Sequence, residues 1–320
     1  MKRKLSLMIL IAVVAIFTAA CGSSSQSSTG DSEKKKGKEV ITVKHQLGET
    51  EVEKNPEKVV VFDFGALDTL DKLGVEVTGV PKQNLPAYLD KYKDDKYKNA
   101  GGLMEPDFEA IKEMEPNLII ISGRQQDSYD QFAEIAPTIY LGVDTKKYLE
   151  SFKSNVNIIA EIFGKKTEAS KELTAIENSI NSLKEHVSET ESKALITLVT
   201  GGKISAYGPG SRFGIIHDVL GVKPVTEELD AAAVHGTKIS VEFIVEKNPD
   251  ILYVVDRDAV VSQGENGASA KEVIENDLVK KTNAYKNGQI YYLNPNYWYL
   301  SGGGLISVAE MVKEVQEGIK

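Results

Sequence analysis

The chain has 320 residues, a formal net charge of −9 and a single cysteine. Nucleic-acid phosphates require a basic face, so this acidic chain argues against nucleic acid as a partner. One cysteine cannot form an internal disulfide. With 41% hydrophobic and 27% charged residues, the composition is that of a globular protein of one large or two medium domains.

The first residues predict export. Three basic residues follow Met1, and the next 16 residues, 5–20, carry no charge. This layout is typical of a secretory signal over residues 1–20, and the apolar run is short for a transmembrane helix. A membrane anchor that is never cleaved is the alternative, but it leaves the small residues before Cys21 unexplained.

Cys21 predicts a lipid anchor. Its position resembles a bacterial lipobox, in which the thiol is diacylated, although Thr18 stands where that pattern usually has Leu. Residues 21–38 are rich in Ser, Gly, Lys and Glu, so burial of apolar surface cannot offset their ordering entropy. We expect this segment to be a flexible tether that holds a globular receiver at the outer face of the cell membrane.

An internal repeat predicts two similar α/β lobes. Residues 107–124 align with residues 240–257 at a constant offset, 240 − 107 = 133. In each copy a short helix stops before a Pro, and a buried strand follows and ends near an Arg. A second echo relates residues 71–75 to residues 218–222, each closing a helix at Leu-Gly-Val. Alternating strands and helices predict Rossmann-like lobes with mostly parallel sheets, covered on both faces.

A long polar helix is predicted between the lobes. Its apolar residues recur at close to the 3.6-residue period of an α-helix. They are Ala169, Leu173, Ile176, Ile180, Leu183 and Val187. We expect an N-terminal lobe over residues 39–160, a connector over 161–192 and a C-terminal lobe over 193–320. A rigid connector predicts small opening motions, and two facing lobes predict a ligand cleft at the carboxyl ends of their strands.

Arginine usage is the sharpest indication of a binding site. Of the 38 basic residues only four are Arg, and outside the signal these are Arg124, Arg212 and Arg257. Each follows a predicted strand or lies in a Gly-rich loop. The fixed fork of guanidinium donors grips carboxylate or phenolate oxygens, so converging arginines predict an anionic ligand. The alternative is pairing with local acids, such as Asp256 and Asp258 beside Arg257.

Aromatic residues are predicted near the same cleft. Residues 291–299 contain Trp298, the only Trp, while Phe64 follows the first strand at 59–62 and Tyr207 precedes the Arg212 loop. Aromatic rings beside Arg suit a flat, anionic, partly aromatic ligand, although core packing explains any one ring equally well. The candidate ligand contacts beside the arginines are therefore Phe64, Tyr207, Trp298 and Lys82.

Enzyme signatures are missing from the sequence. It contains no Gly-x-Ser-x-Gly, no His-Glu-x-x-His and no Walker loop. The four His residues are scattered, so no set of direct metal ligands is predicted. We expect a binding protein without a cofactor, and a lipid-anchored enzyme is the alternative from another class.

Several segments resemble the iron–siderophore solute-binding proteins of ABC importers. They are residues 54–75, the two Glu-x-Ile…Pro segments of the repeat and the long connector helix. The resemblance covers the chain from Cys21 onward and is strongest to the petrobactin-binding lipoproteins of bacilli. It implies a class III substrate-binding fold and a monomer that delivers a ferric siderophore to a membrane permease for iron uptake.

The resemblance also implies roles for individual residues. Ferric petrobactin is an anionic complex of a citrate-based siderophore with two catechol arms, which fits the three arginines as its clamp. The family docks onto arginines of the permease through one surface Glu in each lobe, which implies Glu109 and Glu242. Haem, cobalamin or another siderophore is the alternative ligand, but a neutral hydroxamate would leave the three arginines without a purpose.

Overall fold

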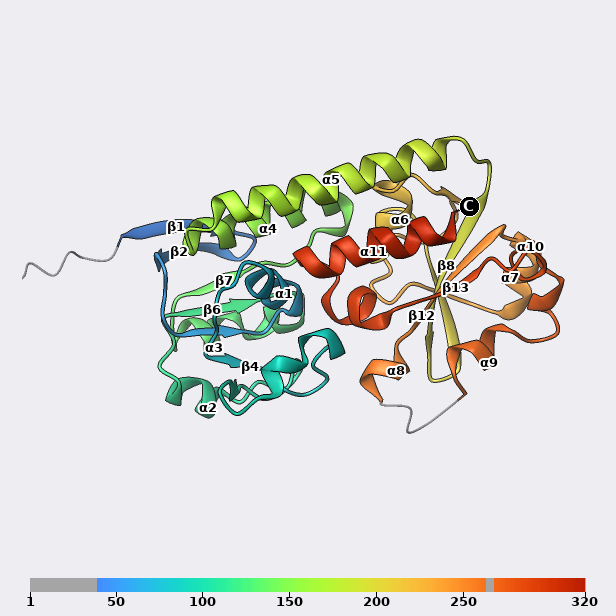
Figure 1. Ribbon diagram of the computed structural model, residues 1–320. Helices are drawn as coiled ribbons and strands as arrows, with labels where there is room; N and C mark the ends of the chain where they lie inside the picture. Colours follow the sequence, from blue (N-terminus) through green and yellow to red (C-terminus); the bar gives the residue numbers. More distant parts are fainter. Residues whose placement is uncertain (1–38, 263–267, 320) are drawn as a thin grey trace, which may run out of the picture. The chain divides into compact units, whose positions relative to one another are not determined.

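The computed structural model describes residues 39–262 and 268–319 (Figure 1). The described residues belong to one compact unit. The predicted signal, Cys21 and the whole predicted tether, residues 21–38, lie outside the described residues. Within the described ranges, no helix is both long enough and apolar enough to cross a membrane.

The sheet of the N-terminal lobe is entirely parallel. A hairpin of β1 (Val40–His45) and β2 (Gly48–Glu53) precedes it. Its strands lie in the order β5-β4-β3-β6-β7, and every neighbouring pair is parallel. They are β3 (Val59–Val61), β4 (Gly79–Val80), β5 (Lys98–Asn99), β6 (Leu118–Ile121) and β7 (Thr138–Tyr140). The predicted first strand is confirmed and ends one residue early.

Short helices connect these strands. The first, α1, begins where the Asp63 carboxylate accepts from the backbone N–H of Ala66 at 2.7 Å, which caps the helix. The helical segments of this lobe are α1 (Phe64–Lys72), η1 (Ala87–Lys93), α2 (Phe108–Glu113), η2 (Gly123–Ser128), α3 (Tyr129–Ala133), η3 (Thr145–Lys147) and α4 (Tyr148–Ile162).

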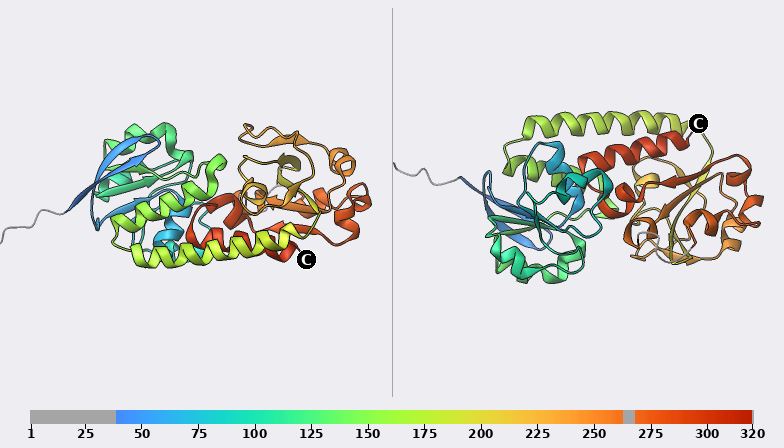
Figure 2. Two further views of the ribbon diagram at one scale, coloured as in Figure 1. Left: turned by 90° about the horizontal axis from the view of Figure 1, so that it is seen from above. Right: turned by 60° about the horizontal axis from the view of Figure 1, so that its bottom comes forward.

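The predicted connector is a single helix, α5 (Lys166–Ser188). Its buried residues are the six that the apolar period indicated, so this expectation is confirmed. At 1.5 Å per residue the helix is about 34 Å long. It runs beside the C-terminal helix α11 (Leu305–Gly318) in both figures (Figures 1 and 2).

The sheet of the C-terminal lobe is mostly parallel, as expected, with three parallel and two antiparallel strand pairs. Its order is β11-β9-β8-β12-β13, with β10 beside β8. Strand β9 is antiparallel to both β8 and β11. Its pairing with β8 follows from Gly201 and Gly202, at φ +53° and +72°, which reverse the chain in a tight hairpin. The strands are β8 (Lys193–Thr200), β9 (Lys203–Tyr207), β10 (Lys223–Pro224), β11 (Thr237–Ile239), β12 (Ile251–Asp256) and β13 (Ile290–Leu293).

The repeat is visible in the structure at the level of helix caps. Asp107 caps α2 through the N–H of Ala110 at 3.0 Å, and Ser240 caps α7 through the N–H of Phe243 at 3.4 Å. Strands β6 and β12 follow these helices in the two lobes. The helical segments of the second lobe are α6 (Ile215–Asp218), α7 (Val241–Lys247), α8 (Asp258–Val261), α9 (Ala270–Ile274), η4 (Val279–Lys281), α10 (Asn283–Lys286) and η5 (Asn296–Ser301).

The first turn of α11 is capped by the other lobe. Asp68 of α1 accepts from the N–H groups of Ile306 at 3.0 Å and Ser307 at 2.9 Å. Thr69 Oγ1 accepts from the N–H of Leu305 at 3.2 Å. The expected C-terminal lobe over residues 193–320 includes α11, yet a helix of the N-terminal lobe satisfies the free N–H groups at its start. The lobes are thus joined by this contact as well as by α5.

Candidate functional site

The three arginines outside the signal meet around one side chain, Tyr299. Arg124 Nη2 and Arg212 Nη2 both donate to the backbone oxygen of Tyr299, at 2.8 and 2.6 Å. Arg257 Nε donates to its phenol oxygen at 2.8 Å. The guanidinium carbons lie 6.0, 4.3 and 5.6 Å from the ring centre for Arg124, Arg212 and Arg257, within the range of cation–π contacts. We call Arg124, Arg212 and Arg257 the arginine cluster.

Two members of the cluster occupy equivalent places in the repeat. Arg124 lies in η2 after β6, and Arg257 lies directly after β12, so each stands at the carboxyl end of a strand. The η2 turn is fixed by Gln125, which accepts from the N–H of Ser122 at 3.2 Å and donates to the Leu103 oxygen at 2.7 Å. Ligands of parallel α/β sheets bind beyond these strand ends, which is where both arginines are placed.

Arg212 comes from the Gly-rich loop 208–214. The N–H of Gly210, which has φ +71°, donates to Asp218 Oδ2 at 2.6 Å and closes the loop. A Cβ on Gly214 would lie 2.6 Å from the same carboxylate oxygen, so only glycine fits there. The loop therefore needs Gly210 for its turn and Gly214 for close packing beside Arg212.

Tyr299 was not among the candidates from the sequence. It lies in η5, a π-helical turn in which the N–H of Gly302 donates to the Tyr297 oxygen at 2.7 Å. Such turns are rare in proteins as a whole, but those that occur are often at functional sites. The aromatic segment 291–299 was indicated by sequence, but the wide turn decides which of its rings faces the cluster.

The electrostatics of the cluster favour an anion. Burial alone would raise the pKa of Tyr299, but the hydrogen bond from Arg257 and the charges of the cluster outweigh it and lower that pKa. Burial and the charge of Arg212 lower the pKa of Arg124, while the carboxylate of Asp63 opposes them. A guanidinium stays protonated at neutral pH, so three positive charges are held together.

The acids beside the cluster balance its charge only in part. Arg257 Nη1 lies 3.4 Å from Asp258 Oδ1, which is the local pairing considered as an alternative. Asp256 instead accepts from the backbone N–H groups of Ala259 and Ala270. Within the described residues the cluster donates five hydrogen bonds, against fifteen N–H groups at five per guanidinium. Ten of the fifteen therefore donate to no described residue, 15 − 5 = 10.

The aromatic candidates are buried, and of the three Tyr207 feels the charge of Arg212. Trp298 is 2% exposed and its indole N–H donates to Glu314 Oε2 at 2.7 Å. Phe64 and Tyr207 are 0% and 2% exposed and pack in the core. All three side chains are buried in this structure, and their contact with a ligand stays a prediction. Lys82 Nζ donates to the backbone oxygens of Lys93 and Asp94, at the C-terminal end of η1.

The two glutamates occupy matching places. Glu109 and Glu242 are exposed and lie in the first turns of α2 and α7. Their offset, 242 − 109 = 133, is that of the repeat. Negative charge in the first turn of a helix is favourable there because of the helix dipole.

Two further observations concern metals and cavities. Among the described residues, no group of three or more His, Cys, Asp or Glu side chains is arranged to hold a metal ion. A cavity of about 340 Å³ lies against the β1–β2 turn, β7 and the start of α4, and no member of the arginine cluster lines it. We place the candidate site at the cluster, because that is where charge and hydrogen-bond donors converge.

The sequence matches known proteins over nearly its whole length. A family model described as "Periplasmic binding protein" matches residues 59–297. Petrobactin-binding protein YclQ of Bacillus subtilis (strain 168) is 51% identical over 99% of this chain and 99% of its own. Ferric-anguibactin-binding protein FatB of Vibrio anguillarum is 32% identical, with 87% of each chain covered.

Solved structures show the same fold. The crystal structure of YclQ from B. subtilis superposes with a TM-score of 0.85 at 53% identity, covering 88% of this chain and 99% of that one. The periplasmic catecholate-siderophore binding protein VctP from Vibrio cholerae gives a TM-score of 0.82 at 37% identity, covering 87% and 100%. The expected arrangement of two α/β lobes on one helical connector is therefore confirmed.

Proposed function

The chain belongs to the periplasmic binding protein family, and on that premise we propose that it is the solute-binding component of an ABC importer for iron. Its ligand is an anionic ferric siderophore, held by the arginine cluster. The protein carries this ligand to a permease in the membrane and does not transform it. Iron arrives as cargo within the siderophore, so the protein needs no metal ligands or cofactor of its own.

The observation that carries this proposal is the convergence of three arginines from both lobes on one point. Arg124 comes from the N-terminal lobe, whereas Arg212 and Arg257 come from the C-terminal lobe. A ligand that engages all three must lie between the two sheets. Guanidinium groups bind carboxylate, catecholate and phenolate oxygens through paired hydrogen bonds, and a neutral ligand would not offset their desolvation.

We propose petrobactin, a catecholate–citrate siderophore, as the preferred ligand. The relative with 51% identity over 99% of both chains is named as a petrobactin-binding protein. Catecholate and carboxylate oxygens are the acceptors that the arginine cluster and the Tyr299 phenol suit. A thermal-shift panel of ferric siderophores tests this: ferric petrobactin should raise the melting temperature more than a ferric hydroxamate siderophore or haem does.

The role of the cluster is tested by Arg212→Ala and Arg257→Ala. We expect each variant to bind ferric petrobactin at least about tenfold more weakly, because a charge-assisted hydrogen bond contributes about 1.5–3 kcal/mol. Binding is measured by quenching of intrinsic fluorescence. Lys223→Ala is the control, since it removes a cation from an exposed ion pair with Glu191 in the same lobe. Unchanged affinity in both arginine variants would refute the clamp.

We further propose that Glu109 and Glu242 dock the protein onto basic residues of the permease. A permease with two-fold symmetry presents the same surface twice, so equivalent glutamates in two lobes match it. The double variant Glu109→Lys, Glu242→Lys should lose iron uptake while keeping its affinity for ferric petrobactin.

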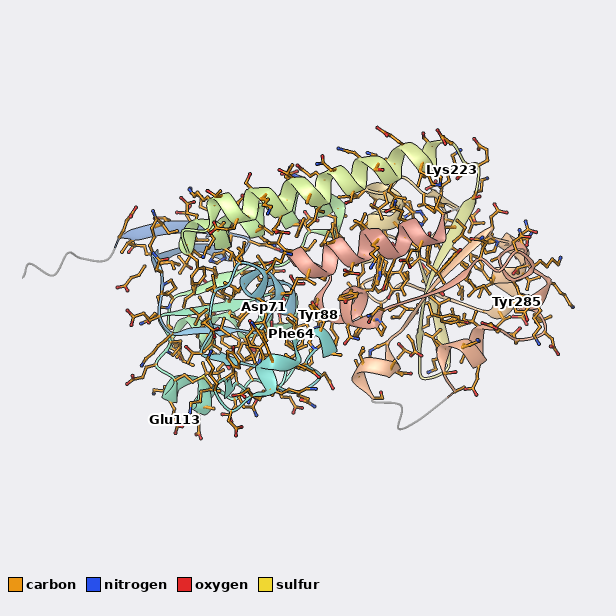
Figure 3. The ribbon with its side chains drawn as sticks, in the orientation of Figure 1. Phe64, Asp71, Tyr88, Glu113, Lys223 and Tyr285 are labelled. Atoms are coloured by element: carbon orange, nitrogen blue, oxygen red, sulfur yellow. The ribbon has the colours of Figure 1, made fainter. Side chains whose placement is uncertain are left out.

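The matched control for docking is Glu113→Lys, Glu246→Lys. These exposed residues also lie in α2 and α7, one turn later, at the same offset of 246 − 113 = 133. Glu113 lies at the outer edge of its lobe in Figure 3. Normal uptake in the first pair, or equal loss in both pairs, would contradict specific docking.

We also propose that the mature protein is a monomer tethered through lipid on Cys21 at the outer face of the cell membrane. Acyl chains on one residue supply durable anchoring, at about 0.8 kcal/mol for each buried methylene. Mass spectrometry of the mature N-terminus tests the anchor. An unmodified Cys21 would mean a freely secreted receiver.

A further inference from the structure

The segment that carries Tyr299, η5, makes contacts with Tyr88 of the N-terminal lobe. The ring of Tyr88, in η1, lies 4.9 Å from the ring of Tyr297. The Tyr88 hydroxyl lies 2.7 Å from Ser301 Oγ. Tyr297 and Ser301 stand two residues before and two residues after Tyr299, so Tyr88 touches η5 on both sides of the residue around which the arginine cluster gathers.

The hydroxyl contacts have a definite direction. Tyr88 Oη lies 3.0 Å from Asp68 Oδ2, and a carboxylate only accepts, so the phenol proton is donated to Asp68. The Ser301 hydroxyl then donates to Tyr88. Asp68 is itself held, because it accepts from two N–H groups at the start of α11. The chain Ser301–Tyr88–Asp68 therefore ties η5 to a fixed point of the N-terminal lobe.

Burial makes this chain strong. Burial of the phenol and the nearby charge of Asp68 raise the pKa of Tyr88, so its hydroxyl stays protonated and remains a donor. Hydrogen bonds to a charged acceptor in a low-dielectric interior are stronger than exposed neutral ones. A neighbouring hydrogen bond also joins η1 to η5, because the N–H of Ala87 donates to Asn296 Oδ1 at 3.0 Å. Figure 3 shows Tyr88 beside the red segment that leads into α11.

We propose that Tyr88 is a positioning residue of the binding site: it holds Tyr299 among the arginines by fixing η5 across the two lobes. It acts through Tyr299 and through the backbone oxygen that Arg124 and Arg212 share. The inference rests on the proposed function, because the ligand bound at the cluster gives this positioning its use. It is distinct from the clamp, since Tyr88 does not contact any of the three arginines among the described residues.

The test variants are Tyr88→Phe and Ser301→Ala, which remove the hydroxyl link and leave the Tyr88 ring in place. The chain supplies a matched control, Tyr92→Phe. Tyr92 lies in η1 as Tyr88 does, and it donates at 3.4 Å to Asp71, which lies in α1 as Asp68 does. It makes no hydrogen bond to η5 within the described residues.

The first measurement needs no ligand. Each protein is titrated and its tyrosinate absorbance recorded. Subtracting the titration of the same protein with Tyr299→Phe leaves the signal of the Tyr299 phenol. Its pKa is lowered by the arginines, whereas burial raises the pKa of Tyr88, Tyr207 and Tyr253. In Tyr88→Phe and Ser301→Ala the pKa of Tyr299 should rise, and in Tyr92→Phe it should stay as in the wild type. An unchanged pKa in both test variants, with the fold intact by circular dichroism, overturns the proposal.

The second measurement is the affinity for ferric petrobactin. Tyr88→Phe and Ser301→Ala should each bind about three- to tenfold more weakly, the double variant should lose no more than either, and the control should stay within about twofold. A raised pKa of Tyr299 with wild-type affinity also overturns the proposal. If the wild type does not bind ferric petrobactin, the proposed ligand fails, while the titration still decides whether Tyr88 positions Tyr299.

Discussion

Replacement of Asp68 by Asn tests how the two lobes are joined. Asp68 is 0% exposed, and its carboxylate accepts from the N–H groups of Ile306 and Ser307 and from the Tyr88 hydroxyl. An amide of the same shape keeps one acceptor oxygen and cannot ionise. The variant therefore removes the titration of this carboxyl, while its amide oxygen still accepts from one of the two α11 N–H groups.

The magnitude follows from the protonation of this carboxyl. Burial, opposed by hydrogen bonds from Ser307, Ile306 and Tyr88, raises the pKa of Asp68 from 3.8 to about 6. A carboxyl with a higher pKa in the folded than in the unfolded chain stabilises the fold when protonated. Its contribution is full below about pH 4 and is lost as the pH rises through about 6. That loss is about 3 kcal/mol, at about 1.4 kcal/mol for each pH unit.

The assay is urea unfolding of wild type and Asp68→Asn at pH 4 and pH 7. The variant lacks the titration, so its unfolding free energy relative to wild type should rise by about 2.5 kcal/mol from pH 4 to pH 7. Asp68→Ala should be about 2 kcal/mol less stable than Asp68→Asn, because buried N–H groups lose their acceptor. Asp90→Asn, on an exposed carboxyl, is the control and should change stability by about 0.5 kcal/mol or less. A pH-independent difference between Asp68→Asn and wild type would refute the reasoning.

Other predictions concern the connector, the aromatic segment and the anchor. Leu183→Ala in α5 should cost about 2–5 kcal/mol in urea unfolding, because Leu183 is fully buried, whereas the exposed Lys184→Ala should not. Glu314 accepts from the Trp298 indole and from the N–H of Asn294, so Glu314→Gln should keep the fluorescence maximum of the single Trp. Glu314→Leu should shift that maximum and lower the free energy of unfolding by about 2 kcal/mol. Identical fluorescence spectra for Glu314→Leu and wild type would contradict this role. Cys21→Ser should move the protein from the membrane fraction to the medium, and continued membrane attachment would argue against the lipid anchor.

Much of the fold could be predicted from local sequence. The six buried residues of α5 were identified by their period, because a helix that crosses a protein surface buries one stripe. The two lobes were indicated by the repeat. In each copy the side chain of a capping residue accepts from the backbone N–H three residues further along the chain. The antiparallel β8–β9 hairpin was missed, although Gly201-Gly202 between two strand-like runs is its signal.

The binding site could be predicted in part. Arginine stood out because the chain otherwise uses Lys, and the structure brings Arg124, Arg212 and Arg257 together. The ring that the arginines contact, Tyr299, was not among the predicted residues. Sequence places Trp298 and Tyr299 side by side, but only packing decides that Trp298 turns into the core and Tyr299 toward the arginines.

Local sequence patterns specify most of the helices and strands of this protein and its repeat, and they single out the three arginines. These depend on residue type and short-range spacing, which the chain carries locally. Tertiary structure alone decided how the lobes are joined at the site. Asp68 caps a helix 238 residues further along, at Ile306, and Tyr88 reaches Ser301 across 213 residues. Contacts at such separation depend on the packing of whole elements, and no local pattern encodes them.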